Sequence, residues 1–295
     1  MMTALEMRRL SGRAGSSLAA LLFAPVLVLL PGVAHADNGW SEAQRGSPLV
    51  LGTSKLAFED LFNTPHTLNG PILWAKQHAD VGLETFDPAG AAAYSIAGGV
   101  LKLRAYQAAD GIHSGNVQST NANQAYQGAQ IVPGRNGFTC VGCYFEVRAQ
   151  FPNARGTWGA FWLLTPDDPR RRGHLEVDAI EYFGAGDKRG HHHSIHRWGP
   201  QEPGGHAKRS DYTGMDAIAD FGWHLYGVDL RGIAEIDGKP ALVVYMDRKE
   251  VARIAADADF FTRPFYFNMT LSINPQDSVR TLPQTVSFDD LRVYK

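Results

Sequence analysis

Three carboxylates stand close together in one short segment, at Glu176, Asp178 and Glu181. In a regular β-strand successive side chains point to opposite faces, so Glu176 and Asp178 share a face and Glu181 points to the other. A β-bulge around Ala179-Ile180 would add one residue to the strand and return Glu181 to the face of the other two acids. The spacing therefore predicts three carboxylates aligned along one surface.

Such a set can perform acid–base and nucleophilic chemistry on a glycosidic bond. A retaining glycosidase uses two carboxyl groups about 5–5.5 Å apart, one as the nucleophile and one as the proton donor. The nucleophile must be ionised, whereas the donor must keep its proton near neutral pH. A neighbouring negative charge and a partly apolar cleft both raise the pKa of the donor. Asp178 would lie between the glutamates, where it can share a proton and orient the nucleophile, so the three groups should titrate as a coupled set.

The alternative for this segment is a solvated strand whose acids face water. Its apolar residues, among them Leu175, Val177 and Ile180, are typical of a central strand instead. Three acids on one face of a central strand cost free energy unless that face lines a cleft. This neighbourhood favours a catalytic site.

The elements that must hold these acids are β-strands. Short runs with alternating apolar residues recur along the chain, separated by Gly, Pro, Asn or Asp, and few segments show helical periodicity. The predicted strands cover residues 100–105, 144–151, 158–164, 225–230, 241–246, 251–254, 265–273 and 286–294. An Asp-Gly pair at Asp237 predicts a hairpin turn between two of them. Many strands without a fixed repeat indicate a single β-sandwich over residues 55–295, preceded by an extended N-terminal segment at 37–54.

The N-terminus has the pattern of a secretory signal peptide, predicted for residues 1–36. Arg8, Arg9 and Arg13 precede an apolar stretch, and a small-x-small motif ends at Ala36. The alternative is a retained membrane anchor, for which the apolar run is short. Cleavage after Ala36 leaves 295 − 36 = 259 residues and changes 28 basic against 30 acidic residues to 25 against 29, a net charge of about −4. This balance gives no general nucleic-acid signal.

Two cysteines, Cys140 and Cys143, form a Cys-x-x-Cys motif. In an exported protein such a pair is often oxidised. A disulfide and two free thiols both remain open for this pair, whereas a zinc site is disfavoured because no second Cys or His pair stands at ligand spacing.

The order of motifs resembles glycoside hydrolase family 16, the laminarinase, agarase and carrageenase group. Residues 176–181 match its Glu-x-Asp-x-x-Glu signature, and residues 156–164 resemble its Trp-Pro-Ala-Phe-Trp strand, with Gly159 in place of the proline. The other resembling segments are residues 58–63, 193–198, 221–229, 264–268 and 288–294. The likeness thus covers nearly the whole chain that would remain after signal cleavage, with the motifs in the order of the family.

This resemblance implies a β-jelly-roll sandwich of two antiparallel sheets, with the substrate lying in a concave cleft. It implies Glu176 as nucleophile, Glu181 as general acid/base and Asp178 as the assisting carboxylate in a double displacement. No cofactor or metal is required for that chemistry. Many members bind a structural calcium; Asp289 fits one ligand position, but Leu61 stands where the other ligand is usually acidic.

Aromatic side chains are the expected platform for the apolar faces of sugar rings. The candidates are Trp158, Trp162 and Trp198, with His196 as a hydrogen-bonding partner for a hydroxyl group. Each Trp could instead belong to the core, and a position in the cleft is favoured for Trp158 and Trp198.

The stretch 170–209 carries eight Lys or Arg, five acids and six His. A basic surround could steer an anionic polysaccharide to the acids; the alternative is a set of solvated loops whose basicity compensates the acid trio. The sequence as a whole predicts a secreted or periplasmic, monomeric, endo-acting hydrolase of β-linked polysaccharide, either a β-glucan or an acidic exopolysaccharide. A non-catalytic carbohydrate-binding jelly roll and a transglycosylase are the alternatives. No nucleic acid and, after signal cleavage, no membrane is expected as a partner.

Overall fold

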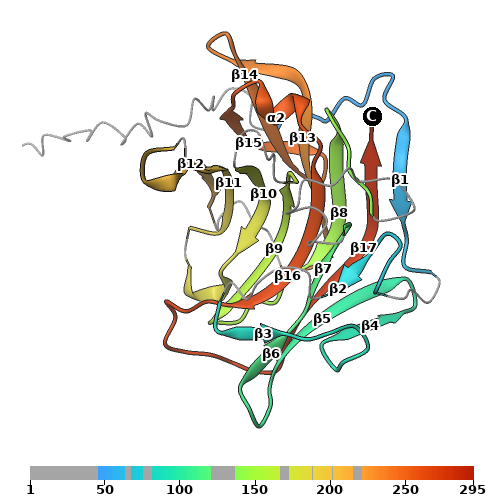
Figure 1. Cartoon of the computed structure of the whole chain (residues 1–295), viewed down its shortest axis with the longest axis vertical. Helices are drawn as coiled ribbons and strands as arrows, with labels where there is room; N and C mark the ends of the chain where they lie inside the picture. The colour runs from blue at the N-terminus through green and yellow to red at the C-terminus, as the bar shows by residue number, and fades with distance from the viewer. Residues whose placement is uncertain are drawn as a thin grey trace, which may run out of the picture. The chain divides into compact units, whose positions relative to one another are not determined.

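The computed structural model describes residues 46–63, 68–75, 82–120, 137–166, 173–187, 189–200, 202–214 and 221–295. The signal peptide predicted for residues 1–36 lies outside these ranges. Strands dominate the described residues and form two sheets (Figure 1). The fold is all-β, as the alternating pattern of the sequence predicts.

The smaller sheet carries the acidic segment. Its seven strands lie in the order β12 (His206–Thr213), β11 (His191–Trp198), β10 (His174–Tyr182), β9 (Thr157–Leu164), β16 (Tyr266–Ile273), β7 (Asn116–Gln118) and β2 (Trp74–Ala75). Every neighbouring pair in this sheet is antiparallel. The acidic strand β10 thus has two strands beyond it on one side and four on the other.

The larger sheet has ten described strands. Along its main path these are β15 (Lys249–Ala255), β14 (Lys239–Met246), β13 (His224–Ile236), β8 (Tyr144–Gln150), β17 (Gln284–Tyr294), β5 (Val100–Gln107), β6 (Ile112–Ser114) and β3 (Glu84–Phe86). Two more strands attach to it, β1 (Leu56–Asp60) to β17 and β4 (Tyr94–Ala97) to β5. The pairing is antiparallel except between β3 and β6. A one-turn helix, α2 (Asp259–Thr262), and two short 3₁₀ turns complete the described elements.

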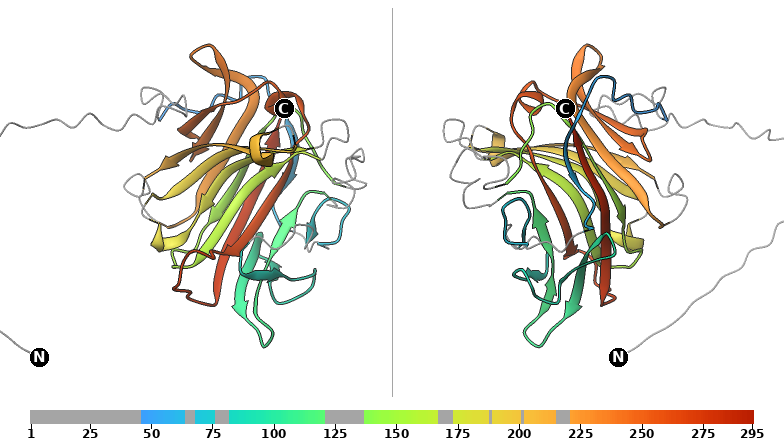
Figure 2. Two further views of the ribbon diagram at one scale, coloured as in Figure 1. Left: turned by 60° about the vertical axis from the view of Figure 1, so that its left-hand side comes forward. Right: turned by 90° about the vertical axis from the view of Figure 1, so that its right-hand side faces the viewer.

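The core lies between the sheets, which Figure 2 shows as two layers of long, curved strands. Strand β9 shows how alternation divides its side chains: Phe161 and Leu163 are fully buried in the core, while Trp158 lies on the opposite face. Gly159 also faces inward, where a Cβ atom would lie 2.6 Å from the ring of Phe151. This close packing accounts for a residue without a side chain at this position.

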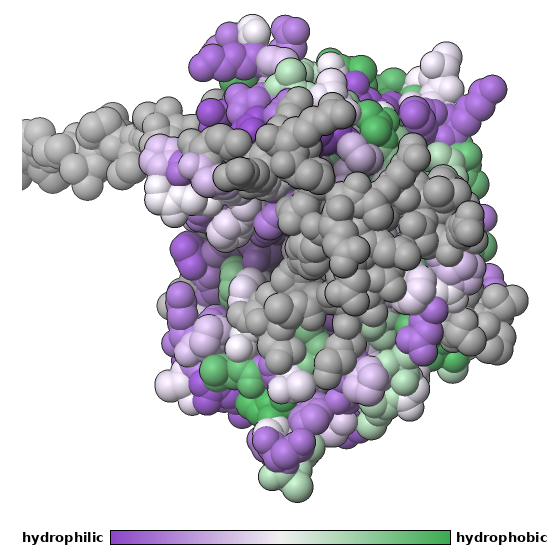
Figure 3. All heavy atoms as spheres, in the orientation of Figure 1, coloured by the Kyte–Doolittle hydropathy of each residue, from purple (hydrophilic) through white to green (hydrophobic). Residues whose placement is uncertain are grey.

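The described surface is mainly hydrophilic on the face seen in Figure 3, with apolar residues in small groups. This distribution agrees with a sandwich that places its apolar side chains between its sheets. No helix in the described part of the chain is long and apolar enough to span a membrane.

Local turn chemistry follows the sequence at the β13–β14 hairpin. Asp237 and Gly238 both adopt positive φ, 50° and 72°, which is the conformation that a two-residue hairpin turn requires. The predicted hairpin is therefore present.

Residues 46–54, the described part of the extended N-terminal segment, lie along the β14–β15 hairpin. The amides of Gly46 and Leu49 donate to the carbonyls of Glu250 and Arg248, and Leu49 and Leu51 pack against a small cluster around Tyr144. This segment is bonded to the sandwich, and it contains a turn in which the Ser54 amide donates to the Leu51 carbonyl.

Cys140 and Cys143 form a disulfide, which is one of the two alternatives that the sequence left open. The bridge closes the turn that leads into β8, and Cys143 is fully buried in the core.

Candidate active site

A bulge in β10 brings the three acids to one face of the smaller sheet. Asp178 pairs with Ser194 and Glu181 with His192, so Ala179 and Ile180 lie opposite the single residue His193. The register to β9 shifts at the same place. Ala179 and Ile180 are both fully buried. The bulge is where the sequence predicts it, and Glu181 joins the face of Glu176 and Asp178.

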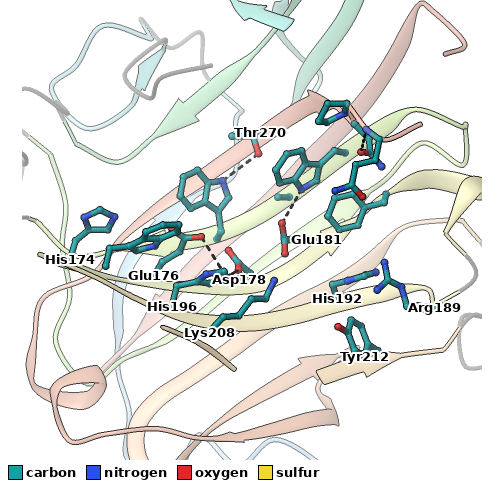
Figure 4. Close-up of a pocket in the computed structure, with 18 residues that line it drawn as sticks. His174, Glu176, Asp178, Glu181, Arg189, His192, His196, Lys208, Tyr212 and Thr270 are labelled. Carbon is teal, nitrogen blue, oxygen red and sulfur yellow. Dashed lines mark hydrogen bonds and ion pairs between the residues drawn. The ribbon is translucent and has the colours of Figure 1, made fainter. Parts of the chain in front are cut away.

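These acids lie on the floor of a cavity of about 880 Å³ (Figure 4). Its walls come from five neighbouring strands, β9, β10, β11, β12 and β16, together with the connection between β10 and β11 and the segment after β16. The residues that line it are Trp158, Ala160, Trp162, His174, Glu176, Asp178, Glu181, Phe183, Arg189, His192, His196, Trp198, Lys208, Tyr212, Thr270, Asn274, Pro275 and Gln276. The structure thus brings all seven predicted site residues into one cavity.

Each glutamate receives a hydrogen bond from an indole. Trp198 Nε1 donates to Glu176 Oε2 at 2.8 Å, and Trp158 Nε1 donates to Glu181 Oε1 at 2.9 Å. Both tryptophans are half-buried, as expected for cleft rather than core positions. A charged acceptor strengthens such a bond, so each indole favours the ionised form of its glutamate.

Asp178 is held by two neighbours on β11. Ser194 Oγ donates to Asp178 Oδ2, and His196 Nε2 lies 3.0 Å from the same oxygen. The Asp178 side chain is only 5% exposed. Its contacts suit a group that positions and polarises its neighbours, because little of its surface faces the cavity.

His196 is supported in turn by His206 from β12. His196 Nδ1 lies 2.6 Å from His206 Nε2, and the His206 ring stacks on Trp198 with centroids 3.8 Å apart. His206 therefore contacts the partners of both Asp178 and Glu176. Reasoning from the sequence missed this residue, because it stood within a polar stretch without apolar alternation.

The electrostatics of the floor favour protons on the glutamates. Burial, followed by repulsion from Asp178, raises the pKa of Glu181 to about 8. Burial and Asp178 also raise the pKa of Glu176 well above its ordinary value, against the hydrogen bond from Trp198. Lys208 opposes the rise of the pKa in both glutamates. The set keeps at least one proton near neutral pH, which is the requirement for a carboxylic acid that donates it.

Replacing Glu181 by glutamine should stabilise the protein increasingly as the pH rises. The pKa of Glu181 is about 8 in the folded protein against 4.5 for the ordinary group, so between these values the folded state holds a proton that the unfolded state has lost. The free energy of unfolding therefore falls as pH rises through this window, and the amide removes that loss. We expect Tm to rise by at least about 2–4 °C relative to wild type at pH 8, with no difference from this source below pH 4.5. Thermal unfolding from pH 4 to 8 measures this; a Tm difference independent of pH would contradict it.

The bulge has its own support in His193. Its Nδ1 lies 2.8 Å from the carbonyl oxygen of Ala179, so Nδ1 carries the hydrogen and donates to the backbone at the bulge. Its Nε2 lies 2.9 Å from Thr213 Oγ1 on β12. The ring of His192 points to the opposite face from His193 and lines the cavity. The ring of His191 packs against Tyr182 in the interior.

We expect His193→Leu to lower both stability and kcat. The substitution leaves the Ala179 carbonyl buried without this donor, at a cost of about 1–3 kcal/mol in the free energy of unfolding, and it loosens the bulge that aims Glu181. Thermal unfolding and reducing-end release measure the two effects. His191→Leu, also buried on β11, serves as control and should retain kcat. Equal kcat in the two variants would show that the His193 ring does not hold the bulge.

One further predicted residue, Trp162, has mixed surroundings. Trp162 lines the cavity but is only 7% exposed, packs with Ala160 and Tyr266, and donates from Nε1 to Thr270 Oγ1 at 3.3 Å. It therefore forms part of the floor, with character of both alternatives that the sequence allowed. Thr270 was not predicted and carries no sequence signal of its own.

Asp289 does not fit a calcium ligand in this structure. Its Oδ2 accepts from Arg148 Nη1 at 3.2 Å, and its Oδ1 accepts from the amide of Asp290 at 2.7 Å. Leu61, at the other family position, brings no side-chain oxygen. The carboxylate is thus paired with a cation of the protein itself.

Comparison with known proteins gives the fold. No family model and no curated protein matches the sequence. Among solved structures, a variant of the non-specific endo-β-1,3(4)-glucanase SCLam from family GH16, co-crystallised with 1,3-β-D-cellotriosyl-glucose, aligns with a TM-score of 0.64 at 19% identity, over 85% of this chain and 98% of that chain.

Two further structures agree. LamAcat from Zobellia galactanivorans gives a TM-score of 0.60 at 17% identity over 82% of this chain and 98% of its own. The laminarinase catalytic domain from Thermotoga maritima MSB8 gives 0.59 at 17% identity over 83% and 99%. This chain therefore has the β-jelly-roll fold of the family 16 endo-β-glucanases, and its candidate carboxylates lie on the face of the seven-stranded sheet.

Proposed function

We propose that this protein is a retaining, endo-acting hydrolase of β-linked polysaccharide. The observation that carries the proposal is the bulged strand β10, which aligns Glu176, Asp178 and Glu181 on the floor of one cavity, with an indole N–H on each glutamate. The names of the similar structures, endo-β-1,3(4)-glucanase and laminarinase, support the same class of reaction.

In the first step Glu176 attacks the anomeric carbon while Glu181 protonates the departing glycosidic oxygen. This requires charge on Glu176 and a proton on Glu181. Burial and Asp178 raise the pKa of both glutamates, and each accepts an indole N–H, so the coupled set holds a proton that this proposal places on Glu181. Glu176, the less buried of the two, carries the charge. In the second step Glu181 removes a proton from water, which attacks the glycosyl-enzyme and releases the sugar with net retention.

Asp178 assists from between the glutamates. Its negative charge raises the pKa of both, and its hydrogen bonds to Ser194 and His196 fix it in place. As Glu176 forms a bond to the sugar and loses its charge, the repulsion between Glu176 and Asp178 is relieved.

Trp158, Trp162, Trp198 and His196 serve as the sugar-binding residues in this proposal. The indole rings of Trp158 and Trp198 stand at opposite ends of the acid row, since one is hydrogen-bonded to Glu181 and the other to Glu176. Subsites on both sides of the cleaved bond suit a polymer bound across the sheet, and the cavity extends across five strands. This supports internal cleavage of a chain.

The signal-peptide pattern of residues 1–36 supports action in the periplasm or outside the cell, and we propose that the protein works there as a monomer. A transglycosylase would use the same intermediate with a sugar as acceptor. A binding-only jelly roll would need neither the shared proton nor the two indole donors on the acids.

The test is reducing-end release from a panel of neutral and anionic β-glycans, with product sizes and anomeric configuration followed by NMR. We expect oligosaccharides of mixed length early in the reaction, with retained configuration. Release of monosaccharide alone would overturn the endo-acting assignment. Binding without any release would favour the binding-only alternative, and chain elongation without a rise in reducing ends would favour the transglycosylase.

A further inference from the structure

The basic stretch around the acids divides into two faces in the structure. Of its described members, Arg197 and Arg209 point away from the cavity: Arg197 Nε donates to Asp257 Oδ2 at 3.1 Å, and Arg209 Nη1 donates to the Ala255 carbonyl at 2.9 Å. Lys208 and Arg189 line the cavity. Only these two of the four described cations therefore face a bound substrate.

Lys208 lies on β12, where every second side chain is on the face of the cavity. His206, Lys208 and Tyr212 lie directly opposite Trp198, His196 and His192 of β11, and opposed residues of an antiparallel pair share a face. The Lys208 side chain is exposed and, within the described part of the chain, makes neither an ion pair nor a hydrogen bond. In Figure 4 it extends past His196 toward the acids. Lys208 is thus a cation at the mouth of the cavity, and its interactions there within the described part of the chain are electrostatic, including those with Glu176 and Glu181.

Arg189 lies at the Glu181 end of the cavity (Figure 4). Asp187 holds its guanidinium through two bonds, from Nε at 3.0 Å and Nη2 at 2.9 Å, and the group lies 5.4 Å from the Tyr212 ring centroid. Its side chain remains 61% exposed. Arg189 is thus a fixed, accessible cation, partly balanced by Asp187.

We propose that Lys208, together with Arg189, binds an anionic group carried by the glycan, a carboxylate or a sulfate ester, so that the substrate of this site is an acidic β-glycan. This inference rests on the proposed function, since it names the substrate class of the same cavity. A neutral glucan would leave Lys208 with hydroxyl groups alone, whereas an anionic group would complete a charge-assisted pair.

Pairing of Lys208 with an anionic group would also change the pKa of Glu181. Lys208 lowers the pKa of Glu181 and so weakens the binding of the proton that the general acid must hold. An anionic group paired with Lys208 cancels that effect, so an acidic substrate strengthens the hold of Glu181 on its proton in the complex. With an anionic substrate, the basic limb of kcat should therefore lie at higher pH than that of kcat/KM, because kcat reports the complex and kcat/KM the free enzyme. A neutral substrate should not separate the two limbs in this way.

The experiment measures binding and turnover separately. Binding uses the full chain with Glu176→Gln against three probes of matched length: a neutral β-1,3-glucan, its carboxymethyl derivative and its sulfate ester. Lys208→Met and Arg189→Met are added in turn, with Lys208→Arg as the charge-retaining variant. Lys102→Met on β5 and Arg104→Met, whose guanidinium lies over Tyr106 in the other sheet, are the matched controls.

We expect Lys208→Met to weaken binding of an anionic probe about tenfold or more and binding of the neutral probe less than about twofold. Lys208→Arg should restore the preference, and raised salt should reduce it. The carboxymethyl and sulfate probes then show which anion the site prefers. The control variants should change nothing.

The outcomes separate the inference from the proposed function. Equal binding of neutral and anionic probes, or an anionic preference that Lys208→Met leaves intact, overturns the inference even where the wild-type protein cleaves glycans. An anionic preference that depends on Lys208, without cleavage by the wild type, supports the inference and overturns hydrolysis. Absence of binding to all three probes overturns the inference.

Discussion

Glu176→Gln is expected to lower kcat on a β-glycan by about 10⁴-fold or more, with binding changed little. The amide cannot form the glycosyl-enzyme, but it keeps the size of the side chain, and its oxygen can still accept the Trp198 N–H that Glu176 accepts at 2.8 Å. Reducing-end release and affinity electrophoresis measure the two quantities.

The control for this variant is Glu235→Gln, since Glu235 is an exposed glutamate on β13 in the other sheet. It should retain wild-type kcat. A Glu176→Gln protein with activity near that of the wild type would show that Glu176 is not the nucleophile. Thermal unfolding of each variant excludes loss of the fold as the cause.

Glu181→Gln is expected to reduce kcat on natural glycans by about 10²–10⁴-fold, and the loss should depend on the leaving group. The leaving group of a dinitrophenyl glycoside, dinitrophenolate, departs without being protonated. Formation of the glycosyl-enzyme from this substrate should therefore be slowed far less than its formation from a glycan. The wild-type kcat/KM on glycans should fall above about pH 8, where Glu181 loses its proton, and this limb should disappear in the variant. Pre-steady-state release of dinitrophenol and full pH profiles measure both effects. An equal loss for both leaving groups would contradict the role of Glu181 as proton donor.

The sequence predicted the parts of the fold that depend on local pattern. Strands with apolar alternation, such as β5 and β8, begin where expected, and the Asp237-Gly238 turn follows from two residues that tolerate positive φ. The bulge at Ala179-Ile180 could be predicted because three acids had to share a face, and the observed register agrees.

Strand β12 shows what the sequence could not give. It has polar residues on both faces, because one face lines the cavity and the strand lies at the edge of the sheet. It therefore lacks the alternation that marks a strand, and its residues were assigned only to a basic stretch. His206 and Lys208 reach the acids through cross-strand pairing with Trp198 and His196, and such long-range register is not encoded in local pattern.

The same limit applies to the charges. The sequence contains eight basic residues between 170 and 209 but does not show which of them face the acids. Lys208 and its neighbour Arg209 point to opposite faces of β12, and only Lys208 lines the cavity. The His191–His193 run is divided in the same way: His192 lines the cavity, while His193 supports the bulge from within. Alternation predicts that neighbouring side chains on a strand point to opposite faces. Which of them points into the cavity depends on how the strand pairs with its neighbours.

The most direct test of the proposed mechanism is to trap the glycosyl-enzyme. A 2-fluoro-substituted dinitrophenyl β-oligoglucoside should inactivate the wild-type protein, and mass spectrometry of the digested protein should locate the sugar on Glu176. The account predicts one adduct, on that residue, and none on Glu176→Gln. An adduct on Asp178 or Glu181, or catalysis with inverted anomeric configuration and no adduct, would contradict it.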